Sequence, residues 1–418
     1  MKNFFYIFAF LFLAGCSNSE FSGNPEDYEN EEVKSISIVC HQPKTANKDI
    51  STYADDNEDY VADPIIINSF DENSLIYISQ MGPSESTNPN FSDFTANASP
   101  YCYVYQYSEN ENANWDYEYN FILPENLTIE GFPDLSGPRR AIDWYTIRNI
   151  GSVGNSFSLY AFHFPLDNIV RWGVEKDQTG TTNPYDKSNF IKSDILGAYH
   201  ATSALNTRLR FNLFHLMVYL KVTLYVPIYK ENVDNTADFK YSGYNAGSFK
   251  GAYVMNASTD FSVEWRTNRS SDTDPPLVQP NTSQKQNIKM YVHPYDDEEI
   301  ITLENIRSSY YPSYTGDDTD EVRVYNFSVL FPNQTFNGNF LCFALQDAED
   351  NMRYYYFAGN QITGDSGNYS LTQGTLQELK LYLPRTTNQT ILVGANVLPW
   401  SDAMTDMTVT QQGTGDGE

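Results

Sequence analysis

The residue with the most specific chemistry in this sequence is Cys16, whose thiol is placed to receive a lipid. It directly follows Gly15 near the end of an apolar run over residues 4–13, and Lys2 supplies a positive charge before that run. A cation, an apolar run and small residues before a lone cysteine are typical of a leader that lipoprotein signal peptidase removes. We therefore predict cleavage between Gly15 and Cys16, lipid on Cys16, and a signal peptide over residues 1–15.

The apolar run is too short to stay in a membrane as a helix. A bilayer-spanning helix needs about 20 apolar residues, and residues 4–13 supply about half of that number. Each buried CH2 group contributes about 0.8 kcal/mol of membrane affinity, and two or more acyl chains anchor a protein stably. We predict that Cys16 tethers the mature chain to the cell outer membrane. An ordinary secretory signal with a chance cysteine stays open as the alternative.

The charge and the length of the chain bound its class. Its 418 residues include 54 acidic and 26 basic residues, for a formal net charge of −28. This balance excludes nucleic acid as a partner, because no basic stripe is available to neutralise phosphates. Residues 16–32 are polar and acidic, which favours a flexible tether. The length predicts about two domains, which we place at 33–210 and 211–418, the second ending in a short polar tail.

Residues that could carry catalysis or hold a metal form no pattern that indicates an enzyme. The five histidines lack the spacing of metal ligands, and no zinc-protease, nucleophile-elbow or phosphate-loop motif occurs. Acidic clusters over 55–59, 296–299 and 317–321 do not match a calcium-binding loop and are predicted to be solvated loops. We predict no catalytic residue, no metal and no cofactor. A secreted hydrolase with two carboxylates in a cleft is kept as the third hypothesis.

The remaining cysteines are too few for a disulfide scaffold. Cys40, Cys102 and Cys342 follow the lipidated cysteine, and an odd number cannot pair completely. Cys102 and Cys342 lie in apolar or aromatic runs, so we predict buried free thiols. A disulfide between Cys40 and Cys102 stays open as an alternative, because exported proteins form disulfides.

Alternating apolar residues predict a fold made of many short strands. Ile36, Ile38 and Cys40 share one face of a first strand, and the longest alternation covers residues 216–226. The alternation over 209–213 has the opposite phase, which predicts a bulge or bend just after it. One short helix is expected within residues 191–205. Because Gly, Pro, Asn and Asp separate most of these runs, we predict an all-β fold of two antiparallel β-sandwiches in tandem.

Three features of the sequence occur together: a cysteine preceded by Leu13-Ala14-Gly15, an Asp-Ile-Leu-Gly-Ala segment at 194–198 followed by a strand that opens with His215-Leu216, and a strand over 391–397 that closes on Pro399-Trp400. Through these features most of the mature sequence resembles the fimbrillin family of Bacteroidales, the lipoprotein subunits and anchors of type V pili. The first feature is specific for lipidation, and the strand motifs are looser. Membership would imply two transthyretin-like antiparallel β-sandwich domains in tandem.

The resemblance also implies assembly by strand exchange with other fimbrial subunits. In this family a protease removes the first strand, and a strand from a neighbouring subunit fills the groove that is left, as in other strand additions at a sheet edge. The removable strand of this chain would be Ser35 to Cys40, with Ile36 and Ile38 among its groove-filling residues. Further partners would be the outer membrane, through the lipid, and host or bacterial surface receptors.

One departure from the family pattern bears on the role of this chain. Pilins that an arginine-specific protease matures need an Arg after the first strand, and no Arg precedes Arg139 here. Lys44 and Lys48 are the candidate cleavage residues. An uncleaved subunit would keep its lipid and its first strand, so we favour an anchor or accessory subunit over a polymerising stalk or tip subunit.

A surface glycan-binding lipoprotein with β-sandwich domains is the alternative function. Four tryptophans could stack on sugar rings if exposed: Trp115, Trp144, Trp172 and Trp265. Two Trp or Tyr side by side on an exposed face would favour glycan binding. A groove covered by the chain's own N-terminal strand would favour the fimbrial interpretation.

Overall fold

The computed structural model describes part of the chain, in separate segments. These segments are residues 32–33, 35–40, 70, 73–80, 88–95, 99, 101–108, 118–125, 127, 139–143, 157–166, 169–180, 183, 185–202, 208–227, 249–265, 275–294, 300–304, 319–346, 350–364, 368–383, 388–399 and 407–408. Strands dominate them, and each described helix is five residues or shorter. The predicted all-β class is confirmed.

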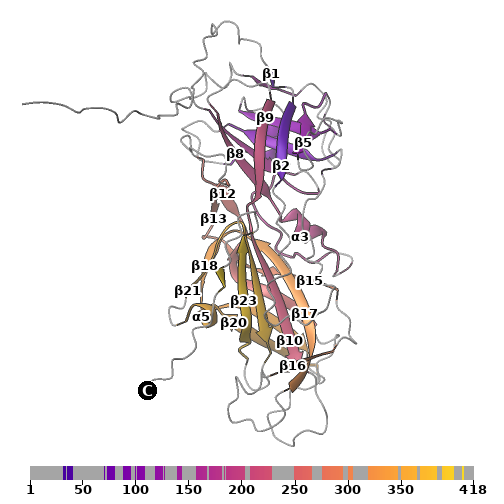
Figure 1. Ribbon diagram of the computed structural model, residues 1–418, viewed down its shortest axis with the longest axis vertical. Helices are drawn as coiled ribbons and strands as arrows, with labels where there is room; N and C mark the ends of the chain where they lie inside the picture. Colours follow the sequence, from indigo (N-terminus) through magenta and orange to yellow (C-terminus); the bar gives the residue numbers. More distant parts are fainter. Residues whose placement is uncertain are drawn as a thin grey trace, which may run out of the picture.

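The N-terminal lobe is a sheet that closes on itself (Figure 1). Its strands are β2 (Ser35–Cys40), β3 (Leu75–Ser79), β4 (Cys102–Tyr107), β5 (Glu118–Ile122), β7 (Phe157–His163), β8 (Leu196–Thr202) and β9 (Arg208–His215). They are hydrogen-bonded in the order β2-β5-β4-β3-β7-β8-β9, with β9 returning to β2. The lobe therefore differs from the predicted antiparallel sandwich, because its strand order closes into a ring and β2 pairs parallel with β9.

A pair of short strands and a short helix accompany this barrel. The two-residue strands β1 (Glu32–Val33) and β6 (Ile142–Asp143) pair with each other, and helix α1 (Phe91–Thr95) precedes β4. The short helix expected within 191–205 is largely wrong. Helix α3 covers Ser188–Lys192, and β8 occupies most of the remaining range because it pairs along its full length with β7.

The C-terminal lobe consists of two packed sheets and two smaller strand pairs. Its strands are β10 (Val218–Pro227), β11 (Phe249–Ser258), β12 (Phe261–Val263), β13 (Val278–Pro280), β14 (Lys285–Lys289), β15 (Tyr291–Val292), β16 (Ile301–Glu304), β17 (Thr319–Phe331), β18 (Gln334–Asn337), β19 (Asn339–Gln346), β20 (Met352–Ala358), β21 (Asn368–Leu371), β22 (Thr375–Tyr382), β23 (Ile391–Pro399) and β24 (Met407–Thr408), with helix α5 (Asn360–Thr363). One sheet runs β15-β17-β10-β22-β23-β24, with β16 also on β17, and the other runs β14-β11-β19-β20. Phe327 of the first sheet contacts Phe249 and Phe343 of the second.

The burial pattern of each strand follows from the number of its faces that are covered. In β10, Leu220 and Val222 are fully buried, whereas the intervening Lys221 is partly exposed. This alternation is the pattern of a strand with one covered face. All five residues of β3 are buried instead. Ile76 faces the barrel core and Tyr77 belongs to the core that continues into the C-terminal lobe, so both faces of β3 are covered.

The chain crosses between the lobes in two residues. Strand β9 ends at His215 in the barrel, and β10 begins at Val218 in the C-terminal lobe. Leu216 and Met217 lie between them, fully buried. The bend predicted from the change of phase therefore coincides with the passage between lobes, and the predicted boundary between residues 210 and 211 falls within β9.

Aromatic side chains fill the contact between the lobes. Trp172 lies 5.0 Å from Phe162 of the barrel and 6.0 Å from Phe261 of β12, measured between ring centroids. Its indole N–H donates a hydrogen bond to the Pro89 carbonyl at 2.8 Å. Trp265 lies 4.7 Å from Tyr160 of the barrel. The two lobes consequently share one continuous core rather than meeting through a hydrated linker.

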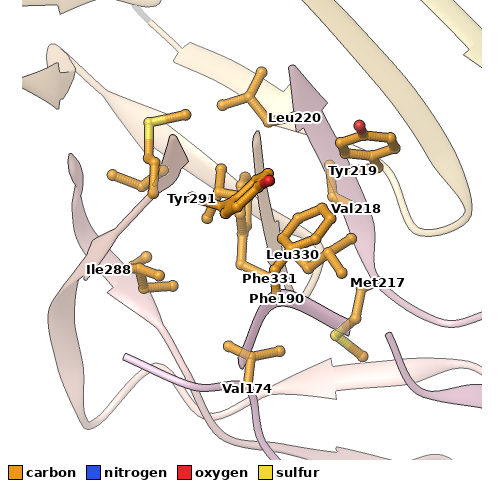
Figure 2. Packing of buried hydrophobic residues seen from close by; sticks show 14 of the residues in the cluster. Val174, Phe190, Met217, Val218, Tyr219, Leu220, Ile288, Tyr291, Leu330 and Phe331 are labelled. Carbon is orange, nitrogen blue, oxygen red and sulfur yellow. The ribbon is translucent and has the colours of Figure 1, made fainter. Parts of the chain in front are cut away.

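The segment between β7 and β8 reaches from the barrel into the C-terminal lobe. Phe190 of α3 packs against Tyr219 and Tyr291, as Figure 2 shows. Gln178 is fully buried, and its side-chain amide bonds both backbone groups of Leu330 in β17, donating to the carbonyl at 2.6 Å and accepting from the N–H at 2.9 Å. The side chain thus replaces a missing strand neighbour for β17.

Replacing Gln178 with Ala should weaken the joint between the lobes. The substitution leaves the N–H and the carbonyl of Leu330 without their partners, and each buried unsatisfied group costs about 1–3 kcal/mol. We expect the free energy of unfolding, measured by urea denaturation, to fall by about 2–4 kcal/mol. The exposed Gln279 is the matched control, because Gln279→Ala should change stability by less than about 0.5 kcal/mol. Equal effects of the two variants would contradict this role.

Candidate functional site

The predicted first strand is present as β2 and has the predicted bounds, Ser35–Cys40. It pairs antiparallel with β5, from Ser35 opposite Ile122 to Val39 opposite Glu118. On its other edge it pairs parallel with β9, in register along the whole strand. The first strand of the barrel therefore fills a slot between two strands that come later in the sequence.

Two buried isoleucines anchor β2 in the barrel core. Ile36 and Ile38 are fully buried and pack into the barrel core with Phe121 and Phe211. Burying an isoleucine side chain contributes about 1.5–3 kcal/mol. Their period of two sets the register, because a slip of one residue would turn both side chains away from the core.

Withdrawal of β2 would leave a defined acceptor. The facing edges of β5 and β9 would each present unpaired backbone N–H and C=O groups, which pair readily with another strand. Between them would lie an apolar slot sized for two β-branched side chains two positions apart. An extended peptide with that spacing fits it, parallel to β9 and antiparallel to β5.

The C-terminal lobe repeats this local arrangement with one decisive difference. Strand β10 lies between the antiparallel β17 and the parallel β22, just as β2 lies between β5 and β9. However, β10 is joined to β9 through only Leu216 and Met217. Cleavage before β10 would therefore cut the connection between the lobes, whereas cleavage after β2 would leave that connection intact.

The two inner motifs of the fimbrillin resemblance meet at the passage between lobes. The His215 Nδ1 and Asp194 Oδ1 atoms lie 2.7 Å apart, and Asp194 is fully buried. Beside them the Leu216 N–H donates to the Ile195 carbonyl at 3.0 Å. Gly197 is needed here, because a Cβ atom would lie 2.8 Å from the nearest Leu216 side-chain carbon. These contacts hold the strand β8 against the start of β10.

The predicted terminal strand is β23, which runs from Ile391 to Pro399 along β22. Its other edge is paired by β24 only at Asn396 and Val397. Trp400 lies outside the described residues.

The other predicted site residues are distributed as follows. Gly15, Cys16, Lys44, Lys48, Trp115 and Trp144 lie outside the described residues. Trp172 and Trp265 pack in the lobe junction and do not form the exposed platform that sugar stacking would require. The free thiols of Cys102 and Cys342 are buried as predicted, which leaves no Cys40–Cys102 disulfide. Burial raises the pKa of Cys342 to about 11.

In the part of the chain that the structure describes, no three His, Cys, Asp or Glu side chains come together in a group that could hold a metal ion. No helix of that part is long and apolar enough to cross a membrane.

Comparison with known proteins finds similarity among solved structures. No protein-family model and no curated protein matches the sequence. Among solved structures, the chain is similar to a "putative cell adhesion protein" of Bacteroides ovatus, at 12% identity and a TM-score of 0.38, over 87% of this chain and 97% of that chain.

Two fimbrial proteins of Porphyromonas gingivalis are similar as well. The fimbrial anchor protein Mfa2 is 8% identical at a TM-score of 0.32, over 88% of this chain and 98% of that chain. The tip fimbrial protein Mfa3 is 7% identical at a TM-score of 0.31, over 88% of this chain and 99% of that chain. The structural neighbours are thus cell adhesion and fimbrial proteins of Bacteroidales, in agreement with the resemblance to fimbrillins.

The contact between His215 and Asp194 should be a strong determinant of stability. Oδ2 of Asp194 is buried without a hydrogen-bond partner, so His215→Leu would leave the whole buried carboxyl unpartnered. Removing one member of a buried pair costs about 3–5 kcal/mol, and we expect a loss of that size in urea unfolding. The double variant Asp194→Asn with His215→Leu should recover part of it, because the carboxylate is gone. A double variant less stable than His215→Leu alone would contradict the pairing.

Proposed function

We propose that this protein is a structural and adhesive fimbrial lipoprotein, which associates with other subunits by exchange of its first strand. The observation that carries the proposal is the position of β2 in the barrel. This strand is the first of the barrel, lies between β5 and β9, and fills its slot with Ile36 and Ile38. A protein that only needed a closed barrel could use any strand at this position. A strand near the chain's beginning is the one that a cut after it would release.

Within that function we propose the role of an anchor or accessory subunit. No Arg precedes Arg139, and the Lys or Arg residues just after β2 are Lys44 and Lys48. A chain that keeps β2 keeps its own slot filled and its lipid attached. Such a subunit ends a fibre at the membrane rather than extending it. A polymerising stalk or tip subunit, matured by a lysine-specific cut, is the alternative.

We further propose that both lobes descend from a transthyretin-like β-sandwich. Support comes from the shared pairing around β2 and β10, each set between an antiparallel and a parallel neighbour. In the N-terminal lobe the sheet has closed into a barrel, whereas the C-terminal lobe keeps two separate layers.

Strand exchange is tested by cutting the chain after β2. A site for a sequence-specific protease replaces residues 43–48, and the cut protein is mixed in mild denaturant with a labelled peptide of residues 33–42. We expect the peptide to displace the cut β2 fragment. A peptide with Ile36→Asp and Ile38→Asp should bind at least about 100-fold more weakly, because it loses the burial of two isoleucines.

Two controls distinguish this strand exchange from nonspecific peptide binding. A peptide of the same composition in reversed order should not bind, and the uncut protein should take up neither peptide. Equal binding of the charged and the natural peptide, or a cut barrel that stays folded and takes up no peptide, would overturn the proposal.

Membrane attachment is expected to depend on Cys16 alone. Cys16→Ser removes the thiol that would carry lipid, so the protein should leave the outer-membrane fraction and lose the lipid mass in intact mass spectrometry. Cys342→Ser is the matched control and should leave both properties unchanged, because that thiol is buried in a strand. An unmodified wild-type cysteine in the membrane fraction would contradict lipidation.

A further inference from the structure

The outward face of the sheet β14-β11-β19-β20 carries a row of side chains in strict register. Lys289 of β14 lies opposite Tyr253 of β11, Tyr253 lies opposite Cys342 of β19, and Cys342 lies opposite Tyr356 of β20. The inward phase of the same strands supplies fully buried residues such as Val254. The row therefore crosses the sheet on the side away from the core.

Small residues and further aromatic surface lie beside this row. Gly251, Ala344 and Tyr354 form the next register line across β11, β19 and β20. A Cβ atom on Gly251 would lie 2.8 Å from the Tyr253 hydroxyl oxygen and 3.0 Å from its ring carbons, so the Tyr253 ring lies along the sheet over this glycine. Tyr354 is 48% exposed. The outward face thus carries tyrosine rings beside the small residues Gly251 and Ala344.

The charge of this sheet is opposite to that of the whole chain. The chain has 54 acidic and 26 basic residues. The four strands contain no Asp or Glu, and their basic residues are Lys250, Lys285, Lys289 and Arg353. Arg353 lies opposite the buried Leu345, on the inward phase, and does not belong to the outward face. Lys285 and Lys289 alternate with the buried Ile288 along β14, so they share the outward face with Tyr253. A local cationic face on an acidic protein selects for an anionic partner.

The carboxylate of Asp177 borders the face. Asp177 Oδ2 lies 3.2 Å from the Lys289 ammonium, and the Asp177 side chain is 55% exposed. Although partial burial raises it, the pKa of Asp177 is held below its usual value by hydrogen bonds from Thr179 and by Lys289. An ion pair this exposed contributes little to stability. A carboxylate of a ligand can therefore exchange with Asp177 at the ammonium.

We propose that this face binds an acidic polysaccharide, with Tyr253, Tyr354 and Tyr356 stacking on sugar rings and Lys289 contacting a sugar carboxylate. Aromatic faces attract the positively polarised C–H groups of sugars, and phenol hydroxyls add hydrogen bonds at the ring edge. Strands β11 and β20 are two strand spacings apart, about 10 Å. An extended chain of sugars spans that distance. The binding requires no strand exchange, so it stands or falls independently of fibre assembly.

The proposal is tested by isothermal titration of the purified full chain with an oligogalacturonate. Its fully methyl-esterified form keeps the sugar rings but loses the charge, and we expect it to bind at least tenfold more weakly. Tyr354→Ala and Lys289→Gln should each weaken binding of the acidic oligosaccharide at least fivefold. Asp177→Asn should strengthen it, because the competing carboxylate is removed.

Two controls decide the origin of any binding. Tyr185→Ala alters a comparably exposed tyrosine outside this sheet and should leave the affinity unchanged. A single-stranded DNA of equal charge tests for charge attraction alone. Absence of oligogalacturonate binding, equal binding of the esterified form, equal binding of the DNA, or unchanged affinity of the correctly folded Tyr354→Ala and Lys289→Gln variants would each overturn the proposal.

Discussion

The structure of the N-terminal lobe depends on one interaction, the backbone pairing of β2 with the edges of both β5 and β9. Strands β5 and β9 face each other across a gap one strand wide, and β2 closes it by pairing with both. Unpaired backbone groups on both edges, together with the core positions of Ile36 and Ile38, would make an empty gap costly. The barrel is therefore closed by the strand that comes first among its strands in the sequence, and the pairing and burial of that strand stabilise the whole barrel. This combination suits a strand that is exchanged between molecules.

Contacts at the lobe junction connect the barrel to the C-terminal lobe. Trp172, Phe190 and Gln178 connect the β7–β8 segment to the C-terminal lobe through aromatic contacts and buried hydrogen bonds. A chain crossing of only two residues adds to the stiffness. A load applied at β2 would pass into the C-terminal lobe through packed side chains. Figure 1 shows the two lobes arranged end to end, an elongated shape that suits the proposed role in a fibre or its anchor.

The division of labour between the lobes follows from chain connectivity. Strand β2 precedes the other strands of the barrel, whereas the equivalent β10 is joined directly to β9 and is followed by the rest of its lobe. The proposed strand exchange therefore involves the N-terminal lobe. In the C-terminal lobe, the sheet β14-β11-β19-β20 carries tyrosines and lysines, and its strands contain no acidic residue. Its outward face is the surface that we propose for ligand binding.

The sequence alone determined the all-β class, the bounds of β2 and the buried thiols, because alternation and turn residues are local signals. It also singled out Asp194 and His215, but as separate motifs. Only the tertiary structure decided that these two side chains meet, that β2 closes a barrel, and that Trp172 and Trp265 are packed inward. Each of these facts is a contact between residues distant in sequence. Period-two patterning shows that a strand has a buried face, but it does not specify which strand or lobe covers that face.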